Sequence, residues 1–273
     1  MHYASFTHYT LHITQFYMKA LILAAGYATR LYPLTKSYPK PLLAVGNKPL
    51  INYILEKLVA AGGIEEIIVV TNSKFIARFR KWSKPIKTKV RLTIVDDLTK
   101  SLKGRLGAIG DMYFAIQKMQ IRSDLLVIGG DNLFDAGLSG FLAFTKTKAG
   151  HPVIGAYDIK DKQEAVNYGV LKLDRQGRVV DFQEKPACPQ STLVAMCLYY
   201  FPKNKLGLVG EYLRAGNKRD ATGFYIDWLR KKEKVYGFVF PGNWHDIGDH
   251  KFYQQAIQAH SGCMPKFKTE EIT

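Results

Sequence analysis

Cations and carboxylates that stand beside glycine or proline in a few short stretches are the candidates for chemistry. In the first stretch, residues 21–43, an apolar run gives way to Gly26, Arg30 and Lys40. Gly26 has no Cβ atom, so a ligand can approach the main chain closely there, and loop amides can bind phosphate. Pro33, Pro39 and Pro41 stiffen the loop. Two restrained cations suit a polyphosphate, although their spacing alone also fits solvated surface charges.

Two aspartates stand beside apolar residues. Asp131 directly follows the apolar run 125–129, and Asp246 follows Trp244. Carboxylates at such positions more often cap a turn or form an ion pair than serve a functional site. Lys185 by itself is typical of an exposed hairpin. Cys188, Cys197 and Cys263 have no C-x-x-C spacing, so the cysteines predict neither a zinc site nor a disulfide framework.

The elements that must position these residues alternate along the first half of the chain. Buried strands are expected at 20–25, 67–71, 92–95, 125–129 and 153–157, and helices at 50–59, 107–119 and 138–148. Repeated strand–helix–strand units predict an α/β fold, a Rossmann-like, three-layer, mixed but mainly parallel sheet with helices on both faces. Ligands collect at the carboxyl ends of such strands, so Gly26 and Asp131 are expected at one edge.

The second half has a different pattern. A β-hairpin is expected around the turn signal from Asp174 to Gly177. Further strands are predicted at 193–201 and 235–240, and further helices at 206–214, 224–231 and 250–260. No linker or repeat separates the halves. We therefore expect a peripheral leader at 1–17, one domain at 18–262 with parts at about 18–150 and 151–250, and a tail at 263–273; whether Met18 is the functional start stays open.

Composition limits the partners. The chain has 273 residues, 47% of them hydrophobic, and a formal charge of +16 that favours anionic ligands. The basic residues do not form a tail typical of nucleic-acid binding, and no apolar run is long enough to span a bilayer. We therefore expect neither a nucleic-acid nor a membrane partner. The cysteine usage favours the cytoplasm.

In order along the chain, short motifs resemble those of the sugar-phosphate nucleotidyltransferases. They are Gly26-Tyr-Ala-Thr-Arg-Leu31, Pro39-Lys-Pro-Leu-Leu43, Leu106-Gly-Ala-Ile-Gly110, Gly130-Asp-Asn132, Tyr168-Gly-Val170, Glu184-Lys-Pro186 and Trp244-His-Asp246. The resemblance covers nearly everything from Met18 to about His260. It implies a GT-A-like nucleotidyltransferase fold with the hairpin as an insertion.

The resemblance also implies the roles of individual residues. It implies that Asp131 and Asp246 hold Mg²⁺, and that Arg30, Lys40 and Lys185 are the catalytic cations. The nucleotide-binding set is Ala25, Gly26, Arg30, Lys40 and Gly107. The sugar-phosphate-binding set is Asn132, Gly169, Glu184 and Lys185. The implied partners are a nucleoside triphosphate and a sugar 1-phosphate.

The implied reaction is an in-line attack by a sugar-phosphate oxygen on the α-phosphorus, which yields an NDP-sugar and pyrophosphate. Such chemistry depends on positioning and charge neutralisation. Two departures from the family pattern, Ala28 for a loop glycine and Cys197 for another glycine, affect the expected binding loops. A non-sugar acceptor such as phosphocholine or inositol phosphate, and a non-catalytic subunit of the same fold, remain alternatives. The base, the acceptor and any homo-oligomeric state are open.

Overall fold

A parallel sheet forms the first half of the structure, which is a computed structural model that describes residues 17–248 and 250–260. Its strands are β1 (Met18–Leu23), β4 (Ile64–Thr71), β5 (Arg91–Asp96) and β6 (Asp124–Gly129), arranged in the order β5-β4-β1-β6. All three pairings are parallel. The predicted leader, apart from Tyr17, and the predicted tail lie outside the described residues.

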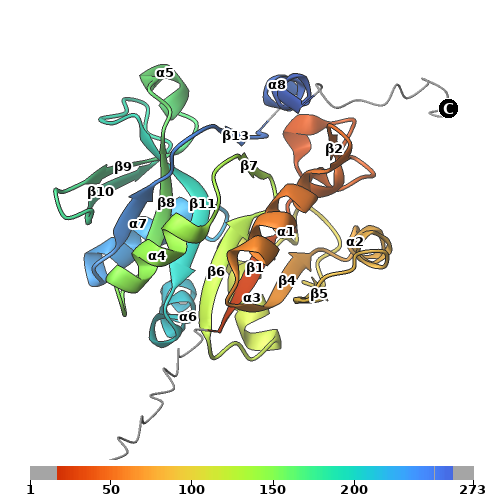
Figure 1. Ribbon diagram of the computed structural model, residues 1–273, viewed down its shortest axis with the longest axis horizontal. Coiled ribbons are helices and arrows are strands. Elements are labelled where there is room, and N and C mark those ends of the chain that lie inside the picture. The colour runs from red at the N-terminus through yellow and green to blue at the C-terminus, as the bar shows by residue number, and fades with distance from the viewer. Residues whose placement is uncertain (1–16, 249, 261–273) are drawn as a thin grey trace, which may run out of the picture.

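The second half adds antiparallel strands to the same nine-stranded sheet (Figure 1). β11 (Leu193–Phe201) pairs antiparallel with β6 and with β8 (Val153–Asp158), and β12 (Tyr236–Val239) pairs parallel with β8. The predicted hairpin is β9 (Gly169–Leu173) and β10 (Val179–Glu184). Its turn forms because the Asp174 carboxylate accepts hydrogen bonds from the backbone N–H groups of Gln176 and Arg178.

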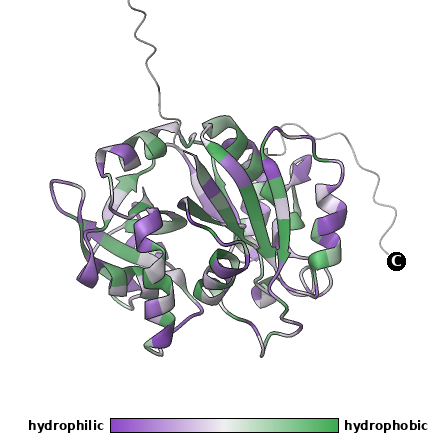
Figure 2. Ribbon diagram, turned by 90° about the horizontal axis from the view of Figure 1, so that it is seen from below, coloured by the Kyte–Doolittle hydropathy of each residue, from purple (hydrophilic) through white to green (hydrophobic). Residues whose placement is uncertain are grey.

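Helices cover both faces of the sheet, as the apolar runs of the strands require. One face packs against α1 (Leu50–Ala61), α2 (Ile76–Ser83) and α4 (Ser139–Thr147). The other packs against α3 (Ala108–Lys118), α6 (Gly207–Arg214) and α7 (Thr222–Lys232). Along β1, Ala20 and Ile22 enter the first core while Leu21 enters the second. Figure 2 shows the apolar strands between more polar helices. The predicted fold class is confirmed.

Several short elements complete the architecture. β7 (Asn132–Phe134) pairs with β13 (Trp244–Asp246), and β2 (Ala44–Val45) pairs with β3 (Lys48–Pro49). A small third core lies under α8 (His250–His260), and α5 (Lys162–Ala165) follows β8. Two 3-10 turns, η1 (Thr29–Leu31) and η2 (Lys40–Leu42), shape the segment after β1, and a third, η3 (Lys203–Lys205), precedes α6. Across the described part of the chain, every helix is too short or too polar to traverse a bilayer.

Candidate active site

The loop that follows β1 is anchored at its start by a hydrogen bond and has free space around Gly26. Asn72 donates to the carbonyl of Ala25 at 2.8 Å, which fixes the end of the strand. A Cβ atom added at Gly26 would meet no heavy atom within 4 Å, so free space surrounds this residue. Ala28 adopts φ 46° and ψ 47°. This left-handed conformation costs a non-glycine residue about 1 kcal/mol, and it explains why glycine would suit this position.

Lys40 and Asp131 meet at the carboxyl edge of the sheet. The Lys40 Nζ atom lies 2.6 Å from Asp131 Oδ2, and the lysine side chain is buried. Pro41, the residue after Lys40, packs against Gly130, the residue before Asp131, because glycine leaves room for it. A Cβ atom at Gly130 would lie 3.0 Å from Pro41 Cγ and 2.9 Å from the Leu23 carbonyl oxygen. The edge of the sheet therefore holds an ion pair between residues 91 positions apart.

Asp246 reaches the same edge through the pairing of β7 with β13. The register places Asp246 opposite Asn132, the residue after Asp131. Burial and the nearby Asp131 carboxylate raise the pKa of Asp246 to about 6, while the cations of Lys40, Arg30 and Lys185 act in the opposite direction. The charges of the other four predicted residues thus all act on Asp246. We call these five residues the charged cluster: Arg30, Lys40, Asp131, Lys185 and Asp246.

Asn132 holds the two halves of this edge together. Its Nδ2 donates to the backbone carbonyls of Met196 and Cys197, and its Oδ1 accepts from Trp244 Nε1 at 2.8 Å. The residue is 2% exposed. The structure therefore gives Asn132 a positioning role, and its predicted contact with the sugar phosphate stays a prediction.

Glu184 and Lys185 enter from the hairpin. Burial raises the pKa of Glu184, while the neighbouring cation of Lys185 lowers it. The carboxylate fits only because two facing residues are glycines: a Cβ atom at Gly223 would lie 1.7 Å from Glu184 Oε2, and one at Gly169 would lie 3.1 Å from it. Gly223 stands in the first turn of α7, whose partial positive charge favours an anion nearby. Sequence reasoning did not identify Gly223.

A cavity of about 160 Å³ opens between these elements. Five predicted residues line it: Arg30, Gly169, Glu184, Lys185 and Asp246. Two more lining residues were singled out from the sequence without a site role, Cys197 as a departure from the family pattern and Tyr168 as part of a motif. The other lining residues were not assigned to the site from the sequence: Asn167, Ala195, Tyr199, Thr222, Gly248 and Phe252. The hydroxyls of Tyr199 and Thr222 are 2.7 Å apart, which joins the wall on β11 to the start of α7. A polar wall of this kind suits a ligand rich in hydroxyl groups.

Cys197 is the departure from the family pattern that faces this cavity. It has φ 51°, at an irregularity in the pairing of β11 with β8 between Ala195 and Tyr199. Burial raises the pKa of its thiol to about 12, with the charge of Asp131 adding to the effect. The thiol therefore stays protonated at neutral pH.

The remaining predicted residues lie outside the lining of that cavity. Lys40 and Asp131 form the ion pair beside it, and Ala25 and Gly26 belong to the open loop. Gly107 precedes α3 with φ 78°, and a Cβ atom there would lie 2.6 Å from the carbonyl oxygen of Arg219. The glycine is therefore required for packing against the segment before α7. Its predicted contact with the nucleotide stays a prediction.

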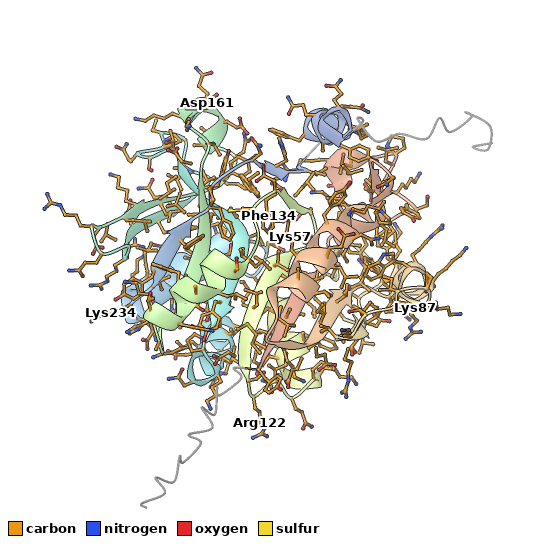
Figure 3. The ribbon with its side chains drawn as sticks, in the orientation of Figure 1. Lys57, Lys87, Arg122, Phe134, Asp161 and Lys234 are labelled. Carbon is orange, nitrogen blue, oxygen red and sulfur yellow. The ribbon has the colours of Figure 1, made fainter. Side chains whose placement is uncertain are left out.

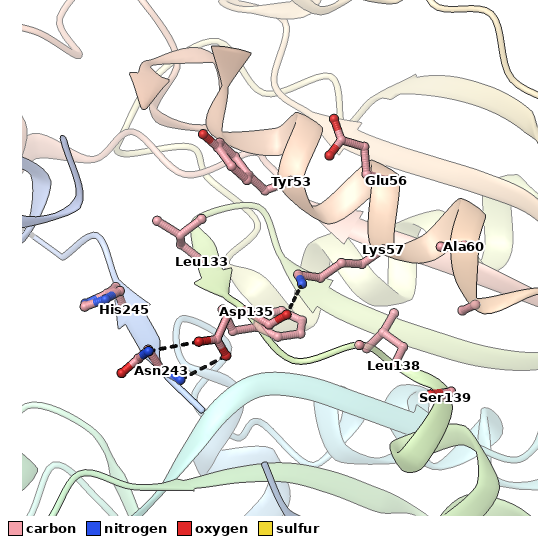
Figure 4. A pocket seen from close by; sticks show the side chains of 13 residues that line it. Tyr53, Glu56, Lys57, Ala60, Leu133, Asp135, Leu138, Ser139, Asn243 and His245 are labelled. Carbon is pink, nitrogen blue, oxygen red and sulfur yellow. Dashed lines mark hydrogen bonds between the residues drawn. The ribbon is translucent and has the colours of Figure 1, made fainter. Parts of the chain in front are cut away.

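A larger cavity of about 860 Å³ lies on the other side of β7 and β13 (Figure 4). Its charged groups are already bonded within the protein. Lys57 donates to the carbonyls of Asp135 and Ala136 at 2.9 and 3.0 Å, and Asn243 donates to the Asp135 carboxylate. The charged cluster therefore marks the better candidate for chemistry.

Comparison with known proteins agrees with this geometry. The model of the nucleotidyl transferase family matches residues 19–261. The chain belongs to this family. It is 29% identical over 234 residues to the bifunctional protein GlmU of Methanocaldococcus jannaschii, covering 85% of this chain and 51% of GlmU. It is 28% identical to mannose-1-phosphate guanylyltransferase 1 of Arabidopsis thaliana, covering 94% of this chain and 68% of that protein.

The fold of this nucleotidyl transferase family member also matches a solved structure. A chain assigned as a glucose-1-phosphate thymidylyltransferase from Bacillus anthracis superposes with a TM-score of 0.74 at 20% identity, covering 92% of this chain and 98% of that one. The resemblance to sugar-phosphate nucleotidyltransferases is confirmed. The chain spans about half the length of the GlmU proteins that it matches.

Proposed function

We propose that the protein transfers a nucleoside monophosphate from a nucleoside triphosphate to a sugar 1-phosphate and releases pyrophosphate. The observation that carries this proposal is the charged cluster, in which three cations and the Asp131 carboxylate, from distant segments, act on the Asp246 carboxylate at a polar cavity. The three cations can offset part of the negative charge of the two phosphate-bearing substrates. A purely structural subunit would have no need to gather three cations and two carboxylates at one edge of the sheet.

The two carboxylates fit a magnesium ion. Asp131 and Asp246 supply hard oxygen ligands, and the pKa of about 6 at Asp246 reflects in part the repulsion between them, which a cation would relieve. Within the described residues, no third His, Cys, Asp or Glu joins them to form a metal-binding group. Water and phosphate oxygens would therefore complete the coordination. When bound, Mg²⁺ would neutralise phosphate charge and orient the reacting groups.

The cations of the charged cluster have different proposed roles because they come from different elements. Lys40 now holds Asp131, and we infer that it turns to the triphosphate when that substrate binds. Arg30 reaches the cavity from the nucleotide loop, whereas Lys185 reaches it from the hairpin. In the reaction, a sugar-phosphate oxygen forms a bond to the α-phosphorus while the bond to pyrophosphate breaks. The attacking phosphate is already anionic, so no general base is required.

A matrix of substrates tests the proposal. Each nucleoside triphosphate is incubated with a panel of sugar 1-phosphates, with phosphocholine and inositol phosphate included, and pyrophosphate is measured with Mg²⁺ and with EDTA. We expect turnover for at least one sugar 1-phosphate, and only with the metal. Absence of turnover with every pair would contradict an enzyme, and preference for a non-sugar phosphate would contradict the acceptor.

Substitution of Lys185 tests whether this residue binds the acceptor, as proposed. Lys185→Ala should raise the KM for the acceptor by at least tenfold, because a charge-assisted contact of roughly 1.5–3 kcal/mol is lost. The donor KM should change little. Lys172→Ala, an exposed lysine on β9, is the matched control and should leave both unchanged. A change confined to the donor would contradict the role given to Lys185.

A further inference from the structure

The positive charge of the chain is concentrated on one segment. Residues 74–91 contain eight Lys and Arg residues and no Asp or Glu, which is half of the formal excess of 16 positive charges. We call this stretch, with α2 at its centre, the basic segment. Its cations are Lys74, Arg78, Arg80, Lys81, Lys84, Lys87, Lys89 and Arg91, and all eight are exposed. Figure 3 shows Lys87 pointing away from the body of the protein.

These cations lack a salt-bridge partner in the described part of the chain. Lys74 donates to the carbonyl of Lys36, and Arg78 lies over the ring of Tyr38 at 5.1 Å. The nearest strand, β5, is the edge strand of the sheet. A repulsive, unpaired charge of this density is stabilised by an anionic partner.

The aromatic residues of the basic segment face inward. Phe75 and Phe79 are 1% and 0% exposed, and Trp82 is half-buried with its Nε1 donating to Asn52 at 2.8 Å. Single-stranded nucleic acid is normally held by exposed aromatic rings on which bases stack. The segment therefore recognises charge without stacking, which favours a phosphate-covered surface over a single strand.

Exposed leucines lie next to the cations. Leu98 and Leu102 are 67% and 43% exposed, in the loop that follows β5. The loop begins beside the basic segment, since the N–H of Ser73 donates to the carbonyl of Thr99 at 2.9 Å. Lys100 and Lys103 alternate with the leucines and are also exposed. Aliphatic side chains among Lys and Arg suit a membrane interface, where the apolar groups enter the headgroup region.

We propose that the basic segment and the loop 98–105 bind the surface of an anionic lipid bilayer. This proposal departs from the sequence-based expectation of no membrane partner, which rested on the lack of a spanning run; a peripheral contact needs no such run. The inference does not depend on the proposed activity. The basic segment lies at the β5 edge of the sheet, whereas the hairpin that carries Lys185 lies at the opposite end (Figure 1).

Sedimentation with vesicles tests this proposal on the full chain. Wild-type protein should bind vesicles of mixed phosphatidylcholine and phosphatidylglycerol, should not bind pure phosphatidylcholine, and should dissociate as salt is raised. The test variant combines Arg80→Gln, Lys81→Gln, Lys84→Gln and Lys87→Gln. Each lost cation should weaken binding roughly fivefold, so the four together should weaken it by about a hundredfold or more.

A matched control tests whether vesicle binding depends on the basic segment or only on the net charge of the protein. It combines Lys146→Gln, Lys162→Gln, Lys172→Gln and Arg175→Gln, four exposed cations elsewhere, and removes the same charge. This control should bind the mixed vesicles within a fewfold of wild type. Equal losses in both variants, or no preference for the anionic vesicles, would overturn the proposal. So would a duplex or single-stranded oligonucleotide that binds more tightly than vesicles and shows the same loss, because the partner would then be a nucleic acid.

Discussion

The carboxyl group of Asp111 should make the stability of this protein fall as the pH rises. Asp111 is 6% exposed in α3, and its Oδ1 has no hydrogen-bond partner among the described residues. Burial and the neighbouring Asp97 carboxylate raise its pKa from 3.8 to about 8. Burial also raises the pKa of Asp97, which accepts two hydrogen bonds from Thr99. The folded protein therefore keeps a proton on Asp111 at neutral pH.

The sign and size of the effect follow from linkage. Between pH 4 and about 8 the folded state holds a proton that the unfolded state has released. The free energy of unfolding therefore decreases by roughly 1.4 kcal/mol per pH unit from this group, or roughly 3 kcal/mol between pH 5.5 and 7.5. The stabilising contribution is complete below the unfolded pKa and is lost as the pH rises through the folded pKa.

Asp111→Asn removes this proton exchange while keeping the shape of the side chain. Urea unfolding at a series of pH values should show a flatter profile for the variant, and the difference from wild type should grow with pH at the slope given above. The control is Asp158→Asn, because hydrogen bonds from Thr192 and Lys160 lower the pKa of Asp158. Its contribution is lost only as the pH falls below the unfolded pKa of 3.8, so its difference curve should be flat between pH 5.5 and 7.5 and should slope in the opposite direction at lower pH. Parallel profiles for wild type and Asp111→Asn would refute the reasoning.

Three further substitutions test the supports of the site. Ala28→Gly should stabilise the protein by up to about 1 kcal/mol, because glycine adopts φ 46° without the cost that alanine bears; urea unfolding measures it, and destabilisation would contradict a strained loop. Gly223→Ala should lower the free energy of unfolding by about 1–3 kcal/mol and weaken acceptor binding, because the added methyl group would displace Glu184. Calorimetry measures the binding, and unchanged binding would contradict a contact between Glu184 and the acceptor. Asn132→Ala should lower the free energy of unfolding in urea by about 2–4 kcal/mol, because Trp244 and two backbone carbonyls lose their hydrogen-bond partner. Trp244→Phe, which removes only one of these bonds, should lower it by less. Equal losses in the two variants would indicate that lost packing, not the hydrogen bonds, is responsible.

Local patterns predict the strands and helices that have a strong hydrophobic period. The parallel strands, the hairpin and the larger helices were predictable because burial on one or both faces leaves a clear apolar pattern in the sequence. α2 was not predicted, since its eight residues bury only Phe79 and carry a dense set of cations. β7 and β13 have three residues each and were also missed. Strands of this length are too short to show an alternating hydrophobic pattern in the sequence.

The family pattern indicated which residues would meet, but the neighbours that hold them could not be predicted. Gly169 was expected to approach the sugar, and the structure adds that it leaves room for Glu184 and Phe182. Gly223 has no motif around it, so nothing in the sequence links it to a residue 39 positions earlier. Such complementarity depends on distances between elements, which a linear pattern does not contain.

The link between Asn132 and Trp244 is the feature on which the proposed chemistry depends most. These residues are 112 positions apart, and their hydrogen bond ties β13 to β7 while the same amide holds β11. Asp131 directly precedes Asn132, and Asp246 lies opposite Asn132 in the pairing of the strands, so this amide positions the backbone that carries both carboxylates. The site therefore cannot form in either half alone. A loss of this junction should separate the carboxylates, so that metal affinity and folding stability decline together, whereas substitution of Lys185 should affect acceptor binding with little loss of stability.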